Sequence, residues 1–368
     1  MFGLKFLRKL DVIVLVSTLV LLAIGLAVLY SSGIKAARVV SEIDTSRQFL
    51  YAAAGLVVML FFARLDYRVL RNYSMVLYIL MIASLVAVDV FGATRLGATR
   101  WISIGFFQFQ PSEFAKPILA IVLAHHFSRH YDHINEFKYW VGSLLYVALP
   151  LALVLAQPDL GTGMVFAAIW FAMAIVARVR WQYLAGLVGS VVVMIPLIIP
   201  RLKPYQQQRI TTFLDPTANP ATTGYNVNQA IIAVGSGGWL GQGLGSGSQS
   251  QGNFLPSQHT DFIFAVLAEK LGFLGGLLML GTFLVLFMRA FWISQMAPDK
   301  FGGLLSIGLV SMLLFHVFIN VGMNLGIMPV TGIPLPLISA GGSSMIVSMF
   351  VIGVVQSVYL RRRKGELV

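Results

Sequence analysis

Residues 12–30 read VIVLVSTLVLLAIGLAVLY, nineteen consecutive residues without a charge. Because a helix rises about 1.5 Å per residue, roughly 20 apolar residues cross the hydrocarbon core of a bilayer. Lys5, Arg8 and Lys9 precede the stretch. The stretch is too long for the apolar core of a secretory signal peptide, and no A-x-A cleavage site follows it. We therefore expect a retained membrane helix here.

The composition extends this expectation to the whole chain. Of 368 residues, 58% are hydrophobic and only 11% are charged, whereas a soluble domain normally carries about 25% charged residues. The mean hydropathy is +0.83. The chain contains no cysteine, which excludes disulfides, thiolate catalysis, iron–sulfur clusters and cysteine-bound zinc.

Apolar stretches recur along the chain at 12–30, 49–63, 73–91, 114–127, 141–156, 161–177, 183–199, 262–290, 304–325 and 340–360. The expected fold class is therefore an all-α integral membrane protein with ten transmembrane helices. Residues 1–368 would form a single polytopic membrane domain. A large extracytoplasmic loop, residues 200–260, would separate the seventh and eighth helices.

Basic residues indicate the orientation. The connections on the side of the two termini hold sixteen Lys and Arg residues, including Arg361–Lys364, and the opposite connections hold eight. Lys and Arg are enriched in cytoplasmic loops, so we expect both termini in the cytoplasm. Topology then explains most of the net charge of +12, and binding to nucleic acid is disfavoured.

The loop at residues 200–260 is far longer than an ordinary connection. Long ordered loops are usually functional, and we favour that interpretation over a mere tether. Val227–Val234 is apolar enough to form a short re-entrant or interfacial helix. Residues 235–252 follow, and eight of these eighteen are glycine.

Motifs for soluble cofactors are missing from the sequence: there is no G-x-x-x-x-G-K-[ST], G-x-G-x-x-G or H-E-x-x-H. His126, His130 and His133 share one face of any helix at that position. Because Arg129 and Lys138 add positive charge nearby, a polar face at headgroup level is favoured over a metal site.

A charged pair lies at the outer end of the fourth expected helix. Ser112 is a candidate N-cap, and Glu113 suits the positive end of a helix. Glu113 and Lys116 are three residues apart and can neutralise each other. Two interpretations stay open: an ion pair that permits insertion, or a pair lining a polar cavity where Lys116 meets an anionic substrate.

Two aspartates stand where expected helices begin. Asp159 is either an Asx-type cap, which we favour, or a carboxylate facing an outer cavity. Asp261 is expected in the first turn of the eighth helix, where the helix dipole stabilises an anion by about 1 kcal/mol or less. Glu269 lies on roughly the same face and deeper, and Lys270 pairs with it or with another group.

Three prolines within Pro329–Pro336 cannot continue a helix. The Gly-Gly-Ser-Ser sequence that ends with Ser343 and Ser344 can start one, with exposed backbone N–H groups suited to phosphate. The simpler alternative is a re-entrant turn that closes the bundle. His316 and Asn320 are four residues apart and are expected to be interhelical hydrogen-bond partners.

Together these features resemble the SEDS family of bacterial shape, division and sporulation proteins, over essentially the whole chain. The motifs that carry the resemblance are GATRWI at 97–102, QPSE at 110–113 with Lys116, QPDLGT at 157–162, HTDFIF at 259–264 with Glu269, and the run from Thr331 to Ser344. The sequence TGIPLP at 331–336 is similar to the elongation branch of the family. Ala340 stands where the family usually has tyrosine, and Ser257 and Lys270 stand where many relatives have glutamate.

The resemblance implies a peptidoglycan glycosyltransferase that polymerises lipid II at the outer face of the bacterial inner membrane during cell elongation. The implied partners are a class B penicillin-binding protein, other elongation-complex membrane proteins and membrane lipid. Asp261 matches the family's catalytic carboxylate. The expected substrate-binding residues are Glu113, Lys116, Asp159, Arg100, His259, Thr260, Ser343 and Ser344.

The residues fit this chemistry. Asp261 would orient or deprotonate the acceptor hydroxyl, while Lys116 and Arg100, or a divalent cation such as Mg²⁺ or Mn²⁺, stabilise the leaving pyrophosphate. Asp261 as a metal ligand stays open. A lipid II flippase and a non-catalytic scaffold are the alternatives. The enzyme is favoured because a flippase needs a polar path to both faces, and ionisable residues are scarce in the inner half.

Overall fold

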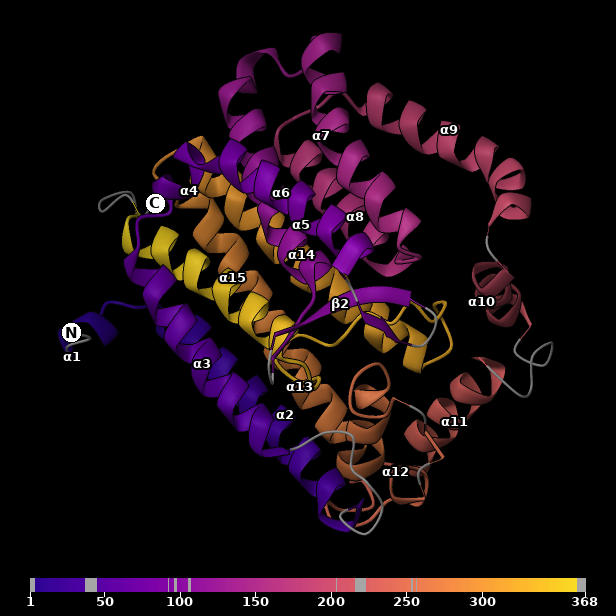
Figure 1. Ribbon diagram of the computed structural model, residues 1–368. Helices are drawn as coiled ribbons and strands as arrows, with labels where there is room; N and C mark the ends of the chain where they lie inside the picture. The colour runs from indigo at the N-terminus through magenta and orange to yellow at the C-terminus, as the bar shows by residue number, and fades with distance from the viewer. Residues whose placement is uncertain are drawn as a thin grey trace.

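The computed structural model describes residues 4–36, 45–91, 93–95, 98–104, 107–202, 204–215, 223–252, 254–255 and 257–362. Most of this part of the chain is helical (Figure 1). The first helices are α1 (Leu4–Leu7), α2 (Val12–Ala36), α3 (Thr45–Arg64), α4 (Arg68–Asn72), α5 (Ser74–Phe91), α6 (Pro111–Arg129), α7 (Phe137–Ala156), α8 (Leu160–Val176) and α9 (Trp181–Ile198). The later helices are α10 (Pro204–Leu214), α11 (Thr223–Ser236), α12 (Ser248–Gln251), α13 (Ile263–Gln295), α14 (Lys300–Asn324) and α15 (Gly342–Leu360), and two 3₁₀ turns are η1 (Tyr131–His133) and η2 (Ile199–Arg201).

Six helices in the described ranges are long and apolar enough to cross a membrane: α2, α3, α7, α13, α14 and α15. Three shorter apolar helical stretches lie at Ser74–Val88, Leu160–Val176 and Trp181–Leu197. The chain is thus a multi-pass helical membrane protein, as its composition predicted.

The helix α14 lies at the centre of the bundle. It packs against α6, α8, α13 and α15, and in Figure 1 it runs between α15 and the group formed by α5, α6 and α8. Most of its side chains are buried, including Leu305, Met312 and Ile319. Residues on α14 can therefore contact several functional segments at once.

The closest helix pair is α3 with α15, which lie side by side in Figure 1. A Cβ atom at Gly353 would lie only 2.5 Å from the carbonyl oxygen of Met59. Small residues allow this approach, as is common where membrane helices pack. This packing joins α15, a late helix in the sequence, to α3, an early one.

The helix α13 is interrupted at Gly272, whose φ of 69° and ψ of −167° are not helical. The glycine-rich segment 237–243 completes the interrupted backbone, since Gln242 N donates to Glu269 O (2.9 Å), Gly243 N to Lys270 O (3.1 Å), Phe273 N to Gly238 O (2.8 Å) and Leu274 N to Trp239 O (3.1 Å). Glycine is needed at Gly272 because it adopts positive φ without steric cost. The segment is therefore an ordered part of the bundle.

Two features of the fold differ from the expectation. A small antiparallel sheet, with strand order β1-β2-β3, joins α5 to α6 through β1 (Ala93–Arg95), β2 (Ala98–Ile104) and β3 (Phe107–Phe109). Short strands next to long apolar stretches give little signal in sequence. The long loop contains the expected helix at 227–234 within α11, and it also contains α10 and α12.

Candidate active site

The predicted pair of charges is present at the start of α6. Lys116 Nζ donates to Glu113 Oε1 at 2.6 Å, and both side chains are almost completely buried. Lys116 Nζ also lies 3.2 Å from His316 Nε2 on α14. In the described chain, Glu113 Oε2 and His316 Nδ1 are buried without a hydrogen-bond partner. A buried polar atom without a partner is costly, so this cluster has the capacity to bind one more polar group.

Asp159 is the N-cap of α8, the interpretation favoured from the sequence. Its Oδ1 accepts from Thr162 N (3.2 Å), and its Oδ2 accepts from Thr162 Oγ1 (2.9 Å). Ser112 Oγ donates to the same carboxylate at 3.3 Å. Ser112 is the second residue of α6 and Gln110 is its N-cap, so the expectation of Ser112 as the cap was wrong. Through Ser112, Asp159 fixes the start of α6 against the start of α8.

Asp261 lies in a turn two residues before α13 begins, and Phe262 is the cap residue. The expectation of Asp261 in the first helical turn was wrong by this small shift. Its main-chain oxygen accepts from Nδ2 of Asn320 and from Nδ2 of Asn324, each at 3.0 Å. A Cβ atom at Gly332 would lie 3.6 Å from Asp261 Oδ2. The carboxylate therefore faces the segment that joins α14 to α15.

The turn that holds Asp261 is tied to this segment by its main chain. The carbonyl of His259 accepts from Ala340 N (2.9 Å), and the carbonyl of Thr260 accepts from Ser339 Oγ (2.7 Å). Two predicted substrate-binding residues thus make structural contacts through their backbones. Direct contacts of their side chains with substrate remain predictions.

Ser343 and Ser344 are buried in the first turn of α15. Ser343 Oγ donates to the carbonyl of Gln108 at 2.9 Å and accepts from Gln110 N at 3.2 Å. Ser343 therefore anchors β3 and the start of α6 to α15. This contact favours the simpler interpretation of this region, in which the helix start closes the bundle. Phosphate binding there stays a prediction.

Arg100 lies in β2, directly before Trp101. Its side chain lies outside the part of the chain whose side chains the structure describes. Its predicted contact with substrate therefore remains untested.

Glu269 and Lys270 point to different partners. Glu269 accepts from Gln249 N (2.7 Å) and Ser250 N (3.0 Å), and it thereby holds the start of α12. Lys270 Nζ donates to Ser31 Oγ on α2 at 2.7 Å. Both residues are buried. The Glu269 side chain connects α12 to α13, whereas the Lys270 side chain connects α13 to α2.

Within the described ranges, no group of three or more His, Cys, Asp or Glu residues is placed to hold a metal ion. A divalent cation at Asp261 stays a prediction. His126 Nε2 lies 2.8 Å from the carbonyl of Tyr139, His130 stacks on the Tyr139 ring, and His133 pairs with Glu136. These contacts fit the polar face expected for the three histidines.

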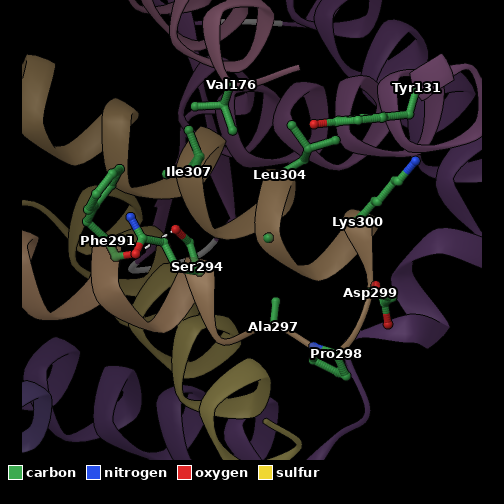
Figure 2. Close-up of a pocket in the computed structure, with 12 residues that line it drawn as sticks. Tyr131, Val176, Phe291, Ser294, Ala297, Pro298, Asp299, Lys300, Leu304 and Ile307 are labelled. Atoms are coloured by element: carbon green, nitrogen blue, oxygen red, sulfur yellow. Dashed lines mark hydrogen bonds between the residues drawn. The ribbon is translucent and has the colours of Figure 1, made fainter. Parts of the chain in front are cut away.

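A cavity of about 360 Å³ lies at the opposite end of α14, between the end of α13, the end of α8 and η1 (Figure 2). It contains none of the predicted site residues. Phe291, Val176 and Ile307 form one side of it, and Lys300 and Asp299 lie at the other.

Beside this cavity, Asp299 caps α14 and holds two other side chains. Its Oδ1 accepts from Gly302 N (2.8 Å), and its Oδ2 accepts from Tyr67 Oη (2.7 Å) and from Arg68 Nε (3.0 Å). Burial alone would raise the pKa of Asp299, but these hydrogen bonds hold it below its ordinary value. Burial, together with Asp299, raises the pKa of Tyr67.

The sequence indicated some of the contacts found at the candidate site. It placed Glu113 with Lys116, and it identified His316 and Asn320 as partners between helices. It missed Asn324, although its four-residue spacing from Asn320 was a usable signal. The structure brings these residues to the region of Asp261, whereas Glu269 and Lys270 serve the loop instead.

Comparison with known proteins identifies the family of this chain. The model of the FtsW, RodA and SpoVE family, described as cell cycle proteins, matches residues 11–364. The peptidoglycan glycosyltransferase MrdB of Escherichia coli K12 is 42% identical over 316 residues, 84% of this chain and 84% of MrdB.

Two solved structures are similar over almost their full length. One comes from work on structural coordination of polymerization and crosslinking by a peptidoglycan synthase complex; its TM-score is 0.83 at 30% identity, covering 97% of this chain and 99% of that one. The rod shape determining protein RodA of Thermus thermophilus has a TM-score of 0.72 at 28% identity, covering 97% and 98%.

The fold and the site thus define a multi-pass helical membrane protein with a cluster of buried polar groups at one end of a central helix. The chain belongs to the FtsW, RodA and SpoVE family, the SEDS family that its motifs resemble.

Proposed function

We propose that this chain is a peptidoglycan glycosyltransferase that polymerises lipid II at the outer face of the bacterial inner membrane during cell elongation and maintenance of rod shape. The names of its relatives support the activity. One observation supports specific residues for this activity. His316 and Asn320, one turn apart on α14, contact Lys116 and the main chain of Asp261, respectively. A cation and a carboxylate are thus linked through a single rigid helix.

The proposed topology has ten membrane spans. Ten long helices, α2, α3, α5 to α9 and α13 to α15, follow the ten expected apolar stretches in order, which supports this count. The excess of Lys and Arg on the side of the termini supports cytoplasmic ends. Asp261 then lies at the outer end of α14, and Asp299 lies at the inner end.

In the proposed reaction, the 4-hydroxyl oxygen of an acceptor sugar forms a bond to the anomeric carbon of a lipid-linked donor. The bond from that carbon to the pyrophosphate breaks, and the pyrophosphate leaves with its electron pair. Asp261 orients the acceptor hydroxyl and takes its proton. A single displacement inverts the anomeric centre, so an α-linked donor gives a β-linkage.

Lys116 is proposed to stabilise the negative charge of the leaving group. Its ammonium group has three N–H donors, and Glu113 and His316 are the two partners found for it in the described chain. One donor thus remains for an anion. Arg100 is proposed to add a second cation. If Asp261 held Mg²⁺ or Mn²⁺, that ion would supply charge stabilisation at the pyrophosphate.

The proposed partner is a class B penicillin-binding protein, which would supply cross-linking. The structural similarity to a chain studied in a peptidoglycan synthase complex supports this proposal. That similarity covers 97% of this chain.

The test is polymerisation of lipid II by the purified full chain in detergent, together with a class B partner whose transpeptidase serine is removed. Wild type should make long glycan strands, and Asp261→Asn should make none. Asp132→Asn is the control, because Asp132 is an exposed carboxylate paired with Lys300 at the other end of α14. If wild type makes no strands but moves labelled lipid II across liposomes, the transporter alternative replaces the enzyme.

A further inference from the structure

A polar stripe runs along the buried face of α14, formed by His316, Asn320 and Asn324. Residues four apart lie on the same face of a helix, and each of these three side chains is at most 2% exposed. Buried amides are retained where they make specific hydrogen bonds. The partners of this stripe therefore indicate its purpose.

Asn320 joins two separate segments. Its Nδ2 donates to the carbonyl of Asp261 at 3.0 Å and to the carbonyl of Ile333 at 2.8 Å. Ile333 directly follows Gly332, which faces the Asp261 carboxylate. One amide group thus sets the spacing between Asp261 and the wall opposite its side chain.

Asn324 holds the same carbonyl from the next turn of α14. Its Nδ2 donates to Asp261 O (3.0 Å) and to Asn320 O (2.7 Å), while its Oδ1 accepts from Ala265 N (3.1 Å). Asn324 therefore ties Asp261 to the first turn of α13. Two amides on one rigid helix fix the peptide that carries the Asp261 side chain.

We infer that Asn320 and Asn324 are positioning residues for glycosyl transfer: their amide groups hold the carbonyl of Asp261, and Asn320 also holds the carbonyl of Ile333, the residue after Gly332. This inference rests on the proposed function. Neither residue touches substrate in this scheme. Reaction rates are sensitive to such placement, and a displacement of about 1 Å can cost about 100-fold.

The test compares Asn320→Asp with Asn320→Leu, which have similar volume and different donors. An ionised carboxylate at this position repels the two carbonyl oxygens, whereas a protonated one donates to one of them. N320D therefore regains a donor when its carboxyl group is protonated at low pH. The charged and titratable groups near it are Asp261 on the adjacent turn, His316 on the same helix, and Lys116 with Glu113 beyond His316.

Polymerisation of lipid II is measured across a pH series, with each variant expressed as a ratio to wild type at the same pH. N320D and N320L should each lose about 10- to 100-fold in kcat with little change in KM. Lowering the pH should restore part of the activity of N320D and none of that of N320L. Asn324→Leu should lower kcat in the same way as N320L.

The matched control is Asn135→Asp. Asn135 Nδ2 also donates to a main-chain carbonyl, that of Arg178, at 3.3 Å, but it lies near η1 at the other end of the bundle. N135D should keep the wild-type kcat. Thermal melting of every variant separates a loss of positioning from a loss of folding.

Three outcomes overturn the inference: a folded N320L with wild-type kcat, an N320D whose ratio to wild type does not rise as the pH falls, or a loss in N135D equal to that in N320D. If N320L does not fold, the pH series of N320D and the kcat of Asn324→Ser decide instead. A wild type that makes no glycan strands overturns the proposed function itself, and that result is distinct from all of these.

Discussion

The two ends of α14 hold an aspartate in opposite ways. At the beginning of the helix, Asp299 accepts hydrogen bonds from Tyr67, Arg68 and Gly302 through its carboxylate. At the other end, Asn320 and Asn324 hold Asp261 through its main-chain carbonyl. The Asp299 carboxylate joins three other residues to the start of α14. At Asp261, the hydrogen bonds from these two asparagines of α14 reach the main chain of the residue.

This difference separates a structural aspartate, Asp299, from the aspartate that we propose as catalytic, Asp261. Carboxylates that are saturated by local donors stabilise a fold and lower their own pKa, as Asp299 does. A carboxylate that acts on substrate must instead be placed accurately by its backbone. Loss of Asp261 should therefore affect chemistry, and loss of the Asp299 contacts should affect stability.

The largest expected effect is on catalysis. Asp261→Asn should lower polymerisation by about 10²- to 10⁴-fold, the usual contribution of a general base. Because asparagine has nearly the same volume as aspartate and the main-chain hydrogen bonds to Asn320 and Asn324 stay in place, the variant should remain folded. Steady-state rates and melting curves of wild type and D261N measure both. Equal polymerisation rates for wild type and D261N would contradict the catalytic role proposed for Asp261.

The next effect concerns the buried pair on α6. Lys116→Met leaves the Glu113 carboxylate buried without its cation, which should cost about 3 to 5 kcal/mol of unfolding free energy. The double variant Glu113→Gln with Lys116→Met should recover most of that stability, since no unpaired charge remains. Its polymerisation should stay lost, because the cation near the leaving group is missing.

Chemical denaturation of the single and double variants, alongside their polymerisation rates, measures this prediction. A double variant that is both stable and active would make the pair a structural feature like Asp299. A double variant that is stable and inactive would support a role of Lys116 in catalysis, as proposed for Asp261.

A smaller effect is expected at the other end of α14. Tyr67→Phe removes one hydrogen bond to Asp299, which should cost about 1 kcal/mol, since bonds to charged groups contribute about 1.5 to 3 kcal/mol and this one is partly exposed to solvent. Polymerisation should be unchanged in kcat. Tyr73→Phe, at an exposed tyrosine, is the control for the loss of a hydroxyl group.

The smallest effect is the pH dependence that Asp299 contributes. Its pKa is lower in the folded protein than its ordinary value of 3.8, so its stabilisation is complete above that value and is lost as the pH falls through the folded pKa. In Asp299→Asn this part of the acid sensitivity should vanish. The difference in melting temperature between wild type and D299N should therefore shrink at acidic pH, and a constant difference would contradict the prediction.

Sequence reasoning was strongest where one physical effect dominates. Long apolar stretches strongly favour helices, and each of the ten stretches overlaps a helix in the described ranges. Six of these helices are long and apolar enough to cross a membrane. The three-residue spacing of Glu113 and Lys116 and the cap at Asp159 are local features, and both are found as predicted.

Contacts between distant segments were harder to anticipate. Lys116 and His316 are 200 residues apart, and only the packing of α6 against α14 brings them together. The spacing of Asn324 from Asn320 places both on one helix face, but the partner of Asn324 is a main-chain carbonyl, which the sequence does not identify. The short strands of residues 93–109 were missed because their pairing, rather than their composition, defines them.

The interruption of α13 at Gly272 has a consequence for how the chain is made. Its unpaired backbone groups are completed by residues 237–243, which leave the ribosome before α13 does. Bare N–H and C=O groups are costly in hydrocarbon, so a nascent α13 finds its backbone partner already synthesised. The segment that completes the interrupted helix is therefore present in the chain before the helix itself is made.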